Sequence, residues 1–549
     1  MFRASETEPQ MSLFDNPSDM MCKRAAKKYE DPKAWQNQFY RMVTSEIDES
    51  LFQPLFKEGR MGAPNASIRR LVAMSVLKEG FGCSDEELME KCDYDLLTRR
   101  ALGLIKMEDA CPSLDTYYLF RRRICDYADE TGENLMERCF ERLTAFQASK
   151  FKIQGKAVRM DSKLIGSNIA WYPRYELIHK TFLQEMQHYM GLLNPSLRKR
   201  VQPWLDEDAK QTVYRSDAET MRERLAVLGD VIYKVLVRVK AQDGLLKRVF
   251  EEQYEVEHGV VTPRDRKSIS ADSVQNPNDP DAEYRRKGNQ QVKGYSVNVT
   301  ETTDEEGKPS LVTAVQVSGA TASDSGFFEE AVAKSESVTG GSVEKVYSDG
   351  AYQSAENRSL PCDGVFTGMQ NRASRFRIER DAEGGAKVRD TETGVIYEAV
   401  RTGGGSLRIP NPDGGSSRWR YFPPGQQESM LFRQHLDNLP QSERNKRNNV
   451  EATIFQLCLH SRNNKTRYRG QRKHELWALA RCMWINLRRI VIFEGKSTPK
   501  LSGNTFPGVL AALSRLLDCV GTFFSALEIR FQLRTIRPVW ITCSQKGVF

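Results

Sequence analysis

Three acidic residues, Asp161, Asp349 and Glu451, stand where metal-dependent chemistry is possible. Residues 155–165 have the alternating pattern of a strand, with Asp161 at or just past its middle. A second predicted strand, residues 343–348, stops at Asp349, and Glu451 lies on a predicted helix. Two strand-borne aspartates with a helical glutamate above them can gather three carboxylates at one edge of a sheet. We therefore predict that these three residues are metal ligands and catalytic residues.

The chemistry that such a cluster serves is phosphodiester cleavage. In-line displacement at phosphorus needs an activated water or 3′ hydroxyl and neutralisation of the developing charge, and two Mg²⁺ ions about 3.5 to 4 Å apart supply both. Mg²⁺ prefers oxygen ligands and keeps several waters, so three carboxylates suffice; Mn²⁺ is a possible substitute. The competing interpretation is solvated surface charge, because 73 Asp and Glu residues allow many such triples to be drawn.

Positive charge gathers near the third acid. Arg447 lies one helical turn before Glu451, and residues 462–473 contain six cations. Residues 441–549 hold 19 Lys and Arg against 6 Asp and Glu, a net charge of +13, whereas the rest of the chain carries −5. This concentration favours a polyanionic partner, with nucleic acid the first candidate. We assign DNA backbone contacts here to Arg447, Arg467, Arg469, Arg472 and Lys473.

The N-terminal part is predicted to be helical. Residues 65–127 have apolar spacings of three and four, and Ser84 with Glu87 forms a capping-box pattern at the start of a second helix. Several short helices, the last rich in arginine, fit a helix-turn-helix-like module that binds DNA. The alternative is an ordinary bundle with solvated arginines. The DNA contacts predicted in this module are Arg121, Arg122 and Arg123.

The order of these patterns predicts an α/β chain: an all-α N-terminal domain, then a mixed sheet with a helical insertion and a β insertion. Residues 295–300 and 311–317 alternate as two antiparallel hairpin partners. The predicted parts are an N-terminal arm (1–60), a helical DNA-binding domain (61–150), a catalytic domain (151–175, 281–361 and 440–495), a helical insertion and linker (176–280), a β-rich insertion (362–439) and a C-terminal helical tail (496–549).

These blocks resemble the DDE transposases of bacterial insertion sequences, in the broad group of insertion sequence five and insertion sequence eleven eighty-two. The resemblance extends from about Gly59 to Arg489. Its most specific parts are SDGAY, which contains Asp349, and RNNVE, which ends at Glu451. Supporting stretches are VRMDSKLIGSNIA around Asp161, NDPDAEYRRKGNQQVKGYSVNVTE, VTAVQVSGATASDSGFF and the N-terminal block that begins GRMGAPNASIRRLVAMSVLKEG.

The resemblance implies a ribonuclease H-like catalytic domain in which Asp161, Asp349 and Glu451 hold the metal ions. It also implies an activity: such enzymes cut at the ends of their own element and join the freed 3′ ends to target DNA. Two positions depart from the family's pattern. Arg444 stands where a Tyr is usual, and the region two turns after the glutamate, where Lys or Arg is common, ends in Cys458. Whether this copy is active is therefore left open at this point.

Other residues carry weaker patterns. Asp324 is placed to cap a helix, and Asp279 and Asp281 flank Pro280 in a predicted turn, with metal contact as the alternative. The eleven cysteines form no CxxC pair and the six histidines form no HxxxH motif, which argues against a zinc cluster or a disulfide scaffold. No run of about 20 apolar residues is present. The N-terminus lacks the apolar core of a secretory signal, so we expect a bacterial cytoplasmic, nucleoid-associated protein without membrane contact.

The function predicted from these features is DNA transposition. Its partners are the terminal inverted repeats of the element and the target DNA, and a homodimer is expected because two element ends must be joined. Two alternatives remain: a nuclease of the same fold that does not transfer strands, and a catalytically inactive DNA-binding protein of that fold.

Overall fold

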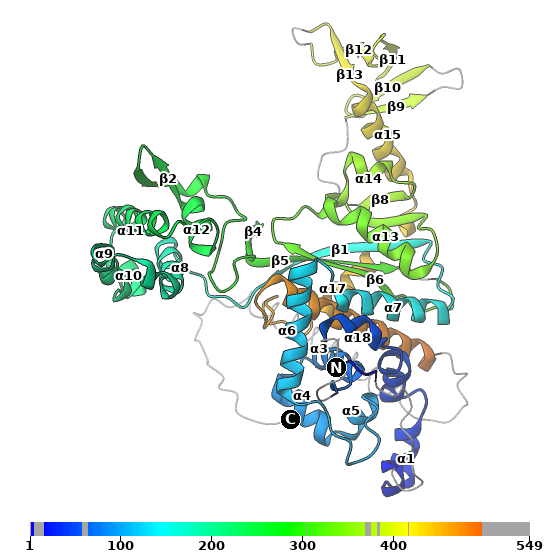
Figure 1. Ribbon diagram of the computed structural model, residues 1–549. Helices are drawn as coiled ribbons and strands as arrows, with labels where there is room; N and C mark the ends of the chain where they lie inside the picture. The colour runs from blue at the N-terminus through cyan, green and yellow to red at the C-terminus, as the bar shows by residue number, and fades with distance from the viewer. Residues whose placement is uncertain are drawn as a thin grey trace, which may run out of the picture. The chain divides into compact units, whose positions relative to one another are not determined.

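The computed structural model describes residues 2–4, 16–56, 64–303, 305–367, 375–380, 385–414 and 417–496 (Figure 1). The chain divides into two units, residues 1–494 and 495–549. The predicted C-terminal tail, residues 496–549, lies outside the described residues except for residue 496. The first unit is mixed α/β, as the sequence predicts. Within the described residues, no helix is both long and apolar enough to cross a bilayer.

The N-terminal part is helical, and its helices begin where the capping residues predict. Ser84 and Glu87 form both hydrogen bonds of a capping box, and the Ser113 hydroxyl accepts the Thr116 N–H at the next long helix. The helices are α1 Lys23–Glu30, α2 Trp35–Phe39, α3 Ile68–Phe81, α4 Asp85–Tyr94, α5 Leu96–Ala101, α6 Leu114–Thr131 and α7 Leu135–Lys150.

Residues 17–56 of the segment predicted as an N-terminal arm are folded into short helical elements. They form short turns of helix, η1 Pro17–Met20, η2 Tyr40–Thr44 and η3 Glu49–Leu55, beside α1 and α2. Phe39, Met42, Val43 and Phe52 are buried in the same core as α3 and α7. Elements of four to eight residues are too short for a helical period to be recognised, so tertiary burial, which the sequence pattern does not report, decides their structure.

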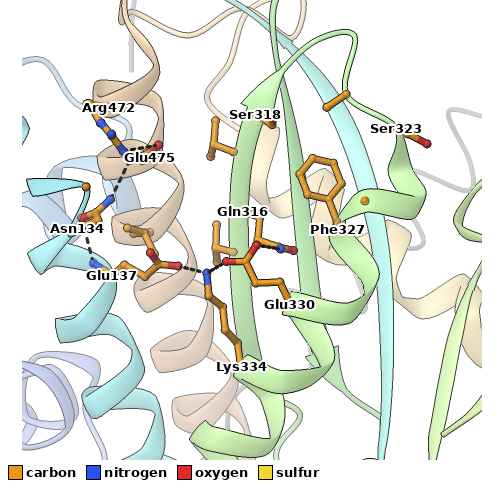
Figure 2. A pocket seen from close by; sticks show the side chains of 16 residues that line it. Asn134, Glu137, Gln316, Ser318, Ser323, Phe327, Glu330, Lys334, Arg472 and Glu475 are labelled. Carbon is orange, nitrogen blue, oxygen red and sulfur yellow. Dashed lines mark hydrogen bonds and ion pairs between the residues drawn. The ribbon is translucent and has the colours of Figure 1, made fainter. Parts of the chain in front are cut away.

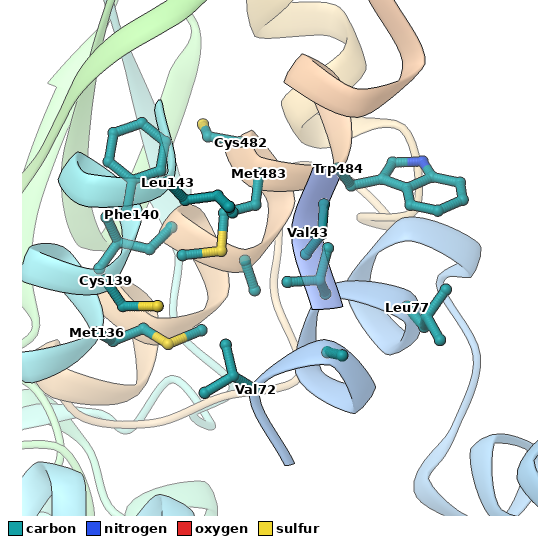
Figure 3. Packing of buried hydrophobic residues seen from close by; sticks show 14 of the residues in the cluster. Val43, Val72, Leu77, Met136, Cys139, Phe140, Leu143, Cys482, Met483 and Trp484 are labelled. Atoms are coloured by element: carbon teal, nitrogen blue, oxygen red, sulfur yellow. The ribbon is translucent and has the colours of Figure 1, made fainter. Parts of the chain in front are cut away.

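Figure 3 shows part of this core, where Val72 and Leu77 of α3, Phe140 of α7 and Trp484 lie among other buried apolar side chains. Trp484 belongs to the long helix α18 Gln471–Lys496, which passes through the N-terminal helices. The same cluster includes Ile165, Val297 and Val299 of the main sheet. One continuous core therefore joins the N-terminal helices, the last helix and one face of the sheet.

The main sheet has six strands in the order β4-β5-β1-β7-β8, with β6 paired to β5. β5 and β6 are the predicted hairpin partners, paired antiparallel, and β5 also runs antiparallel to β1. β7 and β8 continue the sheet parallel to β1. The strands are β1 Ala157–Gly166, β4 Glu283–Lys287, β5 Gln290–Thr302, β6 Val312–Gly319, β7 Lys345–Asp349 and β8 Asp363–Thr367.

Helices cover both faces of this sheet. Val158 and Met160 of β1 pack with α13 Phe328–Thr339, whereas Ile165 packs with α17 Asn449–Cys458 and α18. Because side chains of a strand alternate between faces, Asp161 and Lys163 share the face of Ile165 and point to the side of α17. The helix predicted to carry Glu451 is α17, and it follows a separate short helix, α16 Gln441–Asn445, and a 3₁₀ turn, η8 Lys446–Asn448.

The helical insertion follows β1 and has its own core. Within the range predicted as helical insertion and linker, its helices are followed by a two-stranded antiparallel hairpin. The elements are α8 Arg174–Tyr189, α9 Pro195–Leu205, α10 Ala209–Arg215, α11 Ala218–Val239, α12 Leu245–Gln253, β2 Tyr254–Glu257 and β3 Val260–Pro263.

The second insertion is smaller than predicted. Residues 363–367 of the predicted insertion form β8 of the main sheet, and residues 424–438 form helix α15 Pro424–Asn438, so the insertion's sheet lies between them. Met430 of α15 packs on the sheet of the insertion, and Leu436 packs in the cluster between the main sheet and α13. One helix therefore joins the insertion to the main sheet. The five strands are β9 Phe376–Arg380, β10 Ala386–Asp390, β11 Ile396–Arg401, β12 Leu407–Pro410 and β13 Trp419–Phe422.

Candidate active site

The sheet brings Asp161 and Asp349 side by side. β1 and β7 run parallel, with Arg159 opposite Tyr347, and the same register two residues further places Asp161 level with Asp349. Adjacent strands lie about 4.8 Å apart, and residues at the same level share a face. Asp349 is the last residue of β7, and its carboxylate accepts the N–H of Gly350. The two aspartates predicted from separate motifs are therefore neighbours at one sheet edge.

Glu451 approaches this pair from α17, with Arg447 between them. The Arg447 Nη2 atom lies 3.5 Å from Asp161 Oδ2 and 3.8 Å from Glu451 Oε1. Arg447 Nε is buried without a hydrogen-bond partner among the described residues. The sequence assigned Arg447 to the DNA backbone, whereas in this structure its guanidinium is the counter-ion of two acids. Arg447 lies in the 3₁₀ turn η8, which packs against β1 and β7.

The three acids line one cavity of about 480 Å³, which we call the acid pocket. Burial raises the pKa of Asp161; the Arg447 guanidinium opposes this shift, and the negative charges of Asp349 and Glu451 reinforce it. The three carboxylates therefore act on one another electrostatically, as groups of one site do. Basic residues also line the acid pocket: Lys163, Arg285 and Lys287.

The donor chemistry of the acid pocket suits Mg²⁺, because carboxylate oxygens are its preferred protein ligands. In this arrangement no three His, Cys, Asp or Glu side chains of the described chain stand close enough to hold one ion. The Glu451 side chain is 62% exposed, at the start of its helix. The Arg447 guanidinium lies between the Glu451 and Asp161 carboxylates. Metal binding would therefore need Arg447 to leave the carboxylates and Glu451 to turn inward.

A fourth acid, Asp324, also lines the acid pocket, and the sequence interpretation of it as a helix cap is wrong. The capping position belongs to Ser323, whose side chain makes no capping bond. Asp324 is buried, and its Oδ1 atom accepts a hydrogen bond of 2.7 Å from the Ser162 hydroxyl. The Ser162 N–H in turn donates to Asp161 Oδ1 over 2.9 Å. An acid before a helix looks the same in sequence whether it caps or not, so no local signal distinguishes this role.

The other two aspartates considered lie elsewhere. Asp279 is buried and accepts hydrogen bonds from the hydroxyls of Tyr295, at 2.6 Å, and Ser167. It therefore holds the start of β5 in place rather than facing the acid pocket. Asp281 lines a different cavity, beside α6.

That second cavity, the cationic groove, has a volume of about 860 Å³ and lies between α6 and the segment 467–476. It gathers six of the eight predicted DNA-binding residues, from two stretches more than 340 positions apart in the sequence. Four aspartates also line it, so its charge is mixed. The cations are Arg121, Arg122, Arg467, Arg469, Arg472 and Lys473, and the acids are Asp85, Asp126, Asp129 and Asp281.

The six cations have different environments. Arg121 lies between the rings of Tyr117 and Tyr468, 5.4 and 5.0 Å from their centres, which makes it a packing residue rather than a DNA contact. Arg467 and Arg469 donate to backbone carbonyls, and Arg472 pairs with Asp129. The remaining triplet member, Arg123, lies over the Phe56 ring and does not line the groove.

Arg122 and Lys473 are exposed and, within the described part of the chain, have no ion pair or side-chain hydrogen bond. They are therefore the cations of the groove best placed to meet a phosphate.

A third cavity, of about 420 Å³, lies where α7 and α18 meet β6 and α13 (Figure 2). Lys334 of α13 bridges Glu330 of its own helix and Glu137 of α7, and Gln316 of β6 donates to Glu330. On the other wall, Glu475 accepts from Asn134 and pairs with Arg472. The charged side chains of this cavity form ion pairs and hydrogen bonds with one another. These interactions hold the N-terminal helices against the sheet.

Comparison with known proteins gives one match. Residues 28–123, from α1 to α6, match a family model described as "Transposase domain (DUF772)", which supports a transposase role for the chain. The matched range includes much of the segment predicted as an arm, in agreement with its burial in the core of the N-terminal helices. No curated protein and no solved structure matches the chain.

Proposed function

We propose that this protein is a DNA transposase of the DDE type, with a ribonuclease H-like catalytic domain that cleaves at element ends and transfers the 3′ hydroxyls to target DNA. The observation that carries this proposal is the acid pocket. Asp161 and Asp349 stand level on adjacent parallel strands, and Glu451 faces them from α17, in a chain whose N-terminal part matches a transposase domain.

The topology of the sheet supports the catalytic part of the proposal. Three antiparallel strands, β6, β5 and β1, are continued by two parallel ones, β7 and β8. This order puts β1 next to β7, so the acids on those two strands meet. Helices cover both faces, as such a mixed sheet requires.

Each residue of the site has a role in this proposal. Asp161, Asp349 and Glu451 would hold two Mg²⁺ ions, with Mn²⁺ as a substitute. When bound, Mg²⁺ supplies an activated oxygen nucleophile and neutralises the charge on the phosphate. Asp324 orients Asp161 through Ser162, because Ser162 hydrogen-bonds both carboxylates. Arg447 neutralises the acids and leaves them as the metal ions and DNA enter.

The cationic groove would bind the DNA of the element ends and target by backbone contacts, through Arg122 and Lys473 first. Phosphate contacts of this kind are sequence-independent and weaken steeply with salt. Base reading would come from the N-terminal helices, and two copies of the chain would hold the two ends, on nucleoid DNA in the bacterial cytoplasm.

The test uses purified full-length protein and a supercoiled plasmid that carries the gene with its native flanking DNA. We expect Mg²⁺-dependent cleavage at two sites that flank the gene, and joining of the freed ends to a second plasmid. The variant Asp349→Asn should lose cleavage and keep DNA binding, while Asp363→Asn, on the neighbouring strand outside the acid pocket, should keep both. Cleavage that survives in Asp349→Asn would reject the proposed site, and cleavage without joined products would indicate a nuclease that does not transfer strands.

A second candidate function is DNA binding without catalysis. Its support is the Arg447 guanidinium beside Asp161 and Glu451, together with the open arrangement of the acids in the described chain. Absence of metal-dependent cleavage by the unmodified protein, with DNA binding intact, would decide for this function.

A further inference from the structure

Lys163 lies in the acid pocket two residues after Asp161 on β1. Side chains two apart on a strand point to the same face, and two strand steps span roughly 6.6 Å. The Lys163 ammonium group and the Asp161 carboxylate therefore both face α17, side by side along β1. Lys163 is half-buried in this position.

The charge of Lys163 is uncompensated. Of the other basic residues that line the acid pocket, Arg447 lies against two acids, Arg285 donates to the carbonyls of Ala320 and Ala322 at 3.0 and 2.9 Å, and Lys287 is exposed to solvent. Lys163 makes no ion pair or side-chain hydrogen bond with any described residue. A half-buried ammonium without a partner is unfavourable, so a negatively charged ligand at this place would gain from it.

The helix α17 provides no cation to the pocket after Glu451. Glu451, Ile454, Phe455 and Cys458 all line it, at the spacing of three and four that puts residues on one helix face. Beyond Glu451 this face of α17 is therefore uncharged. Burial raises the pKa of the Cys458 thiol, and the Lys163 ammonium is the largest influence in the opposite direction, which makes the two side chains electrostatic neighbours across the pocket.

We propose that Lys163 binds a backbone phosphate of the DNA strand that is cut, one step along the strand from the phosphate held at the acids. A lysine ammonium binds phosphate as a point charge with three donors. In this role β1 supplies the cation that α17 lacks at Cys458, two turns after Glu451. The inference rests on the proposed function, since it presumes a DNA strand in the acid pocket.

The experiment measures two quantities with the full-length protein: the rate of Mg²⁺-dependent cleavage of the plasmid with the native flanking DNA, and the salt dependence of binding to that DNA. Lys163→Ala should lower the rate about 10- to 100-fold, the effect of losing one charge-assisted hydrogen bond. It should also reduce the slope of log K against log salt by about 0.7 to 0.9, the value of one phosphate contact. Lys163→Arg should stay within a few-fold of the unmodified protein.

The controls separate charge from packing and this inference from the proposed function. Lys199→Ala removes an exposed lysine of the helical insertion and should change neither quantity. The double variant Lys163→Ala, Cys458→Lys returns a cation to the pocket from α17 and should recover cleavage. Unchanged rate and slope in Lys163→Ala, or an equal loss in Lys163→Arg, would overturn the inference. Failure of the unmodified protein to cleave would reject the proposed function, while the salt slope would still test Lys163.

Discussion

Glu301 links α17 to the sheet through buried hydrogen bonds. Its carboxylate is fully buried on β5 and accepts from Arg159 Nε of β1 at 2.5 Å, from Arg489 Nη2 of α18 at 2.7 Å and from the Thr453 hydroxyl of α17 at 2.5 Å. Thr453 is two residues after Glu451. One carboxylate therefore joins the strand that carries the first acid to the helix that carries the third.

We expect Glu301→Gln to destabilise the protein strongly. The substitution keeps the shape of the side chain but removes the negative charge that lies beside the guanidiniums of Arg159 and Arg489, whose side chains are 4% and 17% exposed. Breaking a buried ion pair by neutralising one partner costs about 3 to 5 kcal/mol, whereas replacing every member with apolar groups of similar volume is often neutral. The triple variant Arg159→Met, Glu301→Leu, Arg489→Met should therefore recover most of the loss.

The assay is denaturant unfolding of each variant, followed by tryptophan fluorescence, because Trp477 and Trp484 lie in the core that this network adjoins. Cleavage by Glu301→Gln is measured under conditions where the variant remains folded, and should also fall, because α17 is released from β1. The matched control is Glu398→Gln, an exposed glutamate on β11. A loss below about 1 kcal/mol in Glu301→Gln, or a triple variant less stable than the single one, would refute this reasoning.

Three further predictions concern the acids and the groove. The folded pKa of Asp161 is raised above its ordinary value of 3.8, so ionised Asp161 destabilises the fold at neutral pH. Asp161→Asn should therefore raise the melting temperature at neutral pH, and this gain should shrink as the pH falls through the folded pKa and be absent below 3.8; an equal gain at neutral pH and below 3.8 would contradict this. Metal-dependent cleavage should fall with decreasing pH as Asp161 is protonated, and Arg447→Gln should move the midpoint of the pH–rate profile upward, because its guanidinium opposes the raised pKa; a downward shift would contradict it. Arg122→Gln and Lys473→Gln should each reduce the salt slope of DNA binding by about 0.9 in filter-binding or fluorescence titrations, whereas Arg121→Met, at a packing position between two tyrosines, should lower the melting temperature and leave the slope unchanged.

The sequence predicted the elements whose patterns are local. Alternation gave β1, β5, β6 and β7 to within a few residues, and the Ser84 capping box began α4 where expected. Local patterns failed where burial decided the outcome. The π-helix of residues 40–44 and the 3₁₀ turns beside it are too short to have a period, and β8 was grouped with the insertion because no pattern within a strand reports which sheet it joins.

The sequence by itself named Asp161, Asp349 and Glu451, because each stands in a recognisable motif: Asp161 within a strand, Asp349 at the end of a strand and Glu451 on a helix. Only the tertiary structure placed the first two level on adjacent strands, turned Arg447 from a presumed DNA contact into the counter-ion of Asp161 and Glu451, and added Asp324 and Lys163 to the same pocket. It also joined Arg122 to Lys473 in one groove and assigned Arg121 to packing. The physical reason is that a residue's chemistry depends on which charges and rings lie within a few ångströms, and these come from segments hundreds of positions apart in the chain.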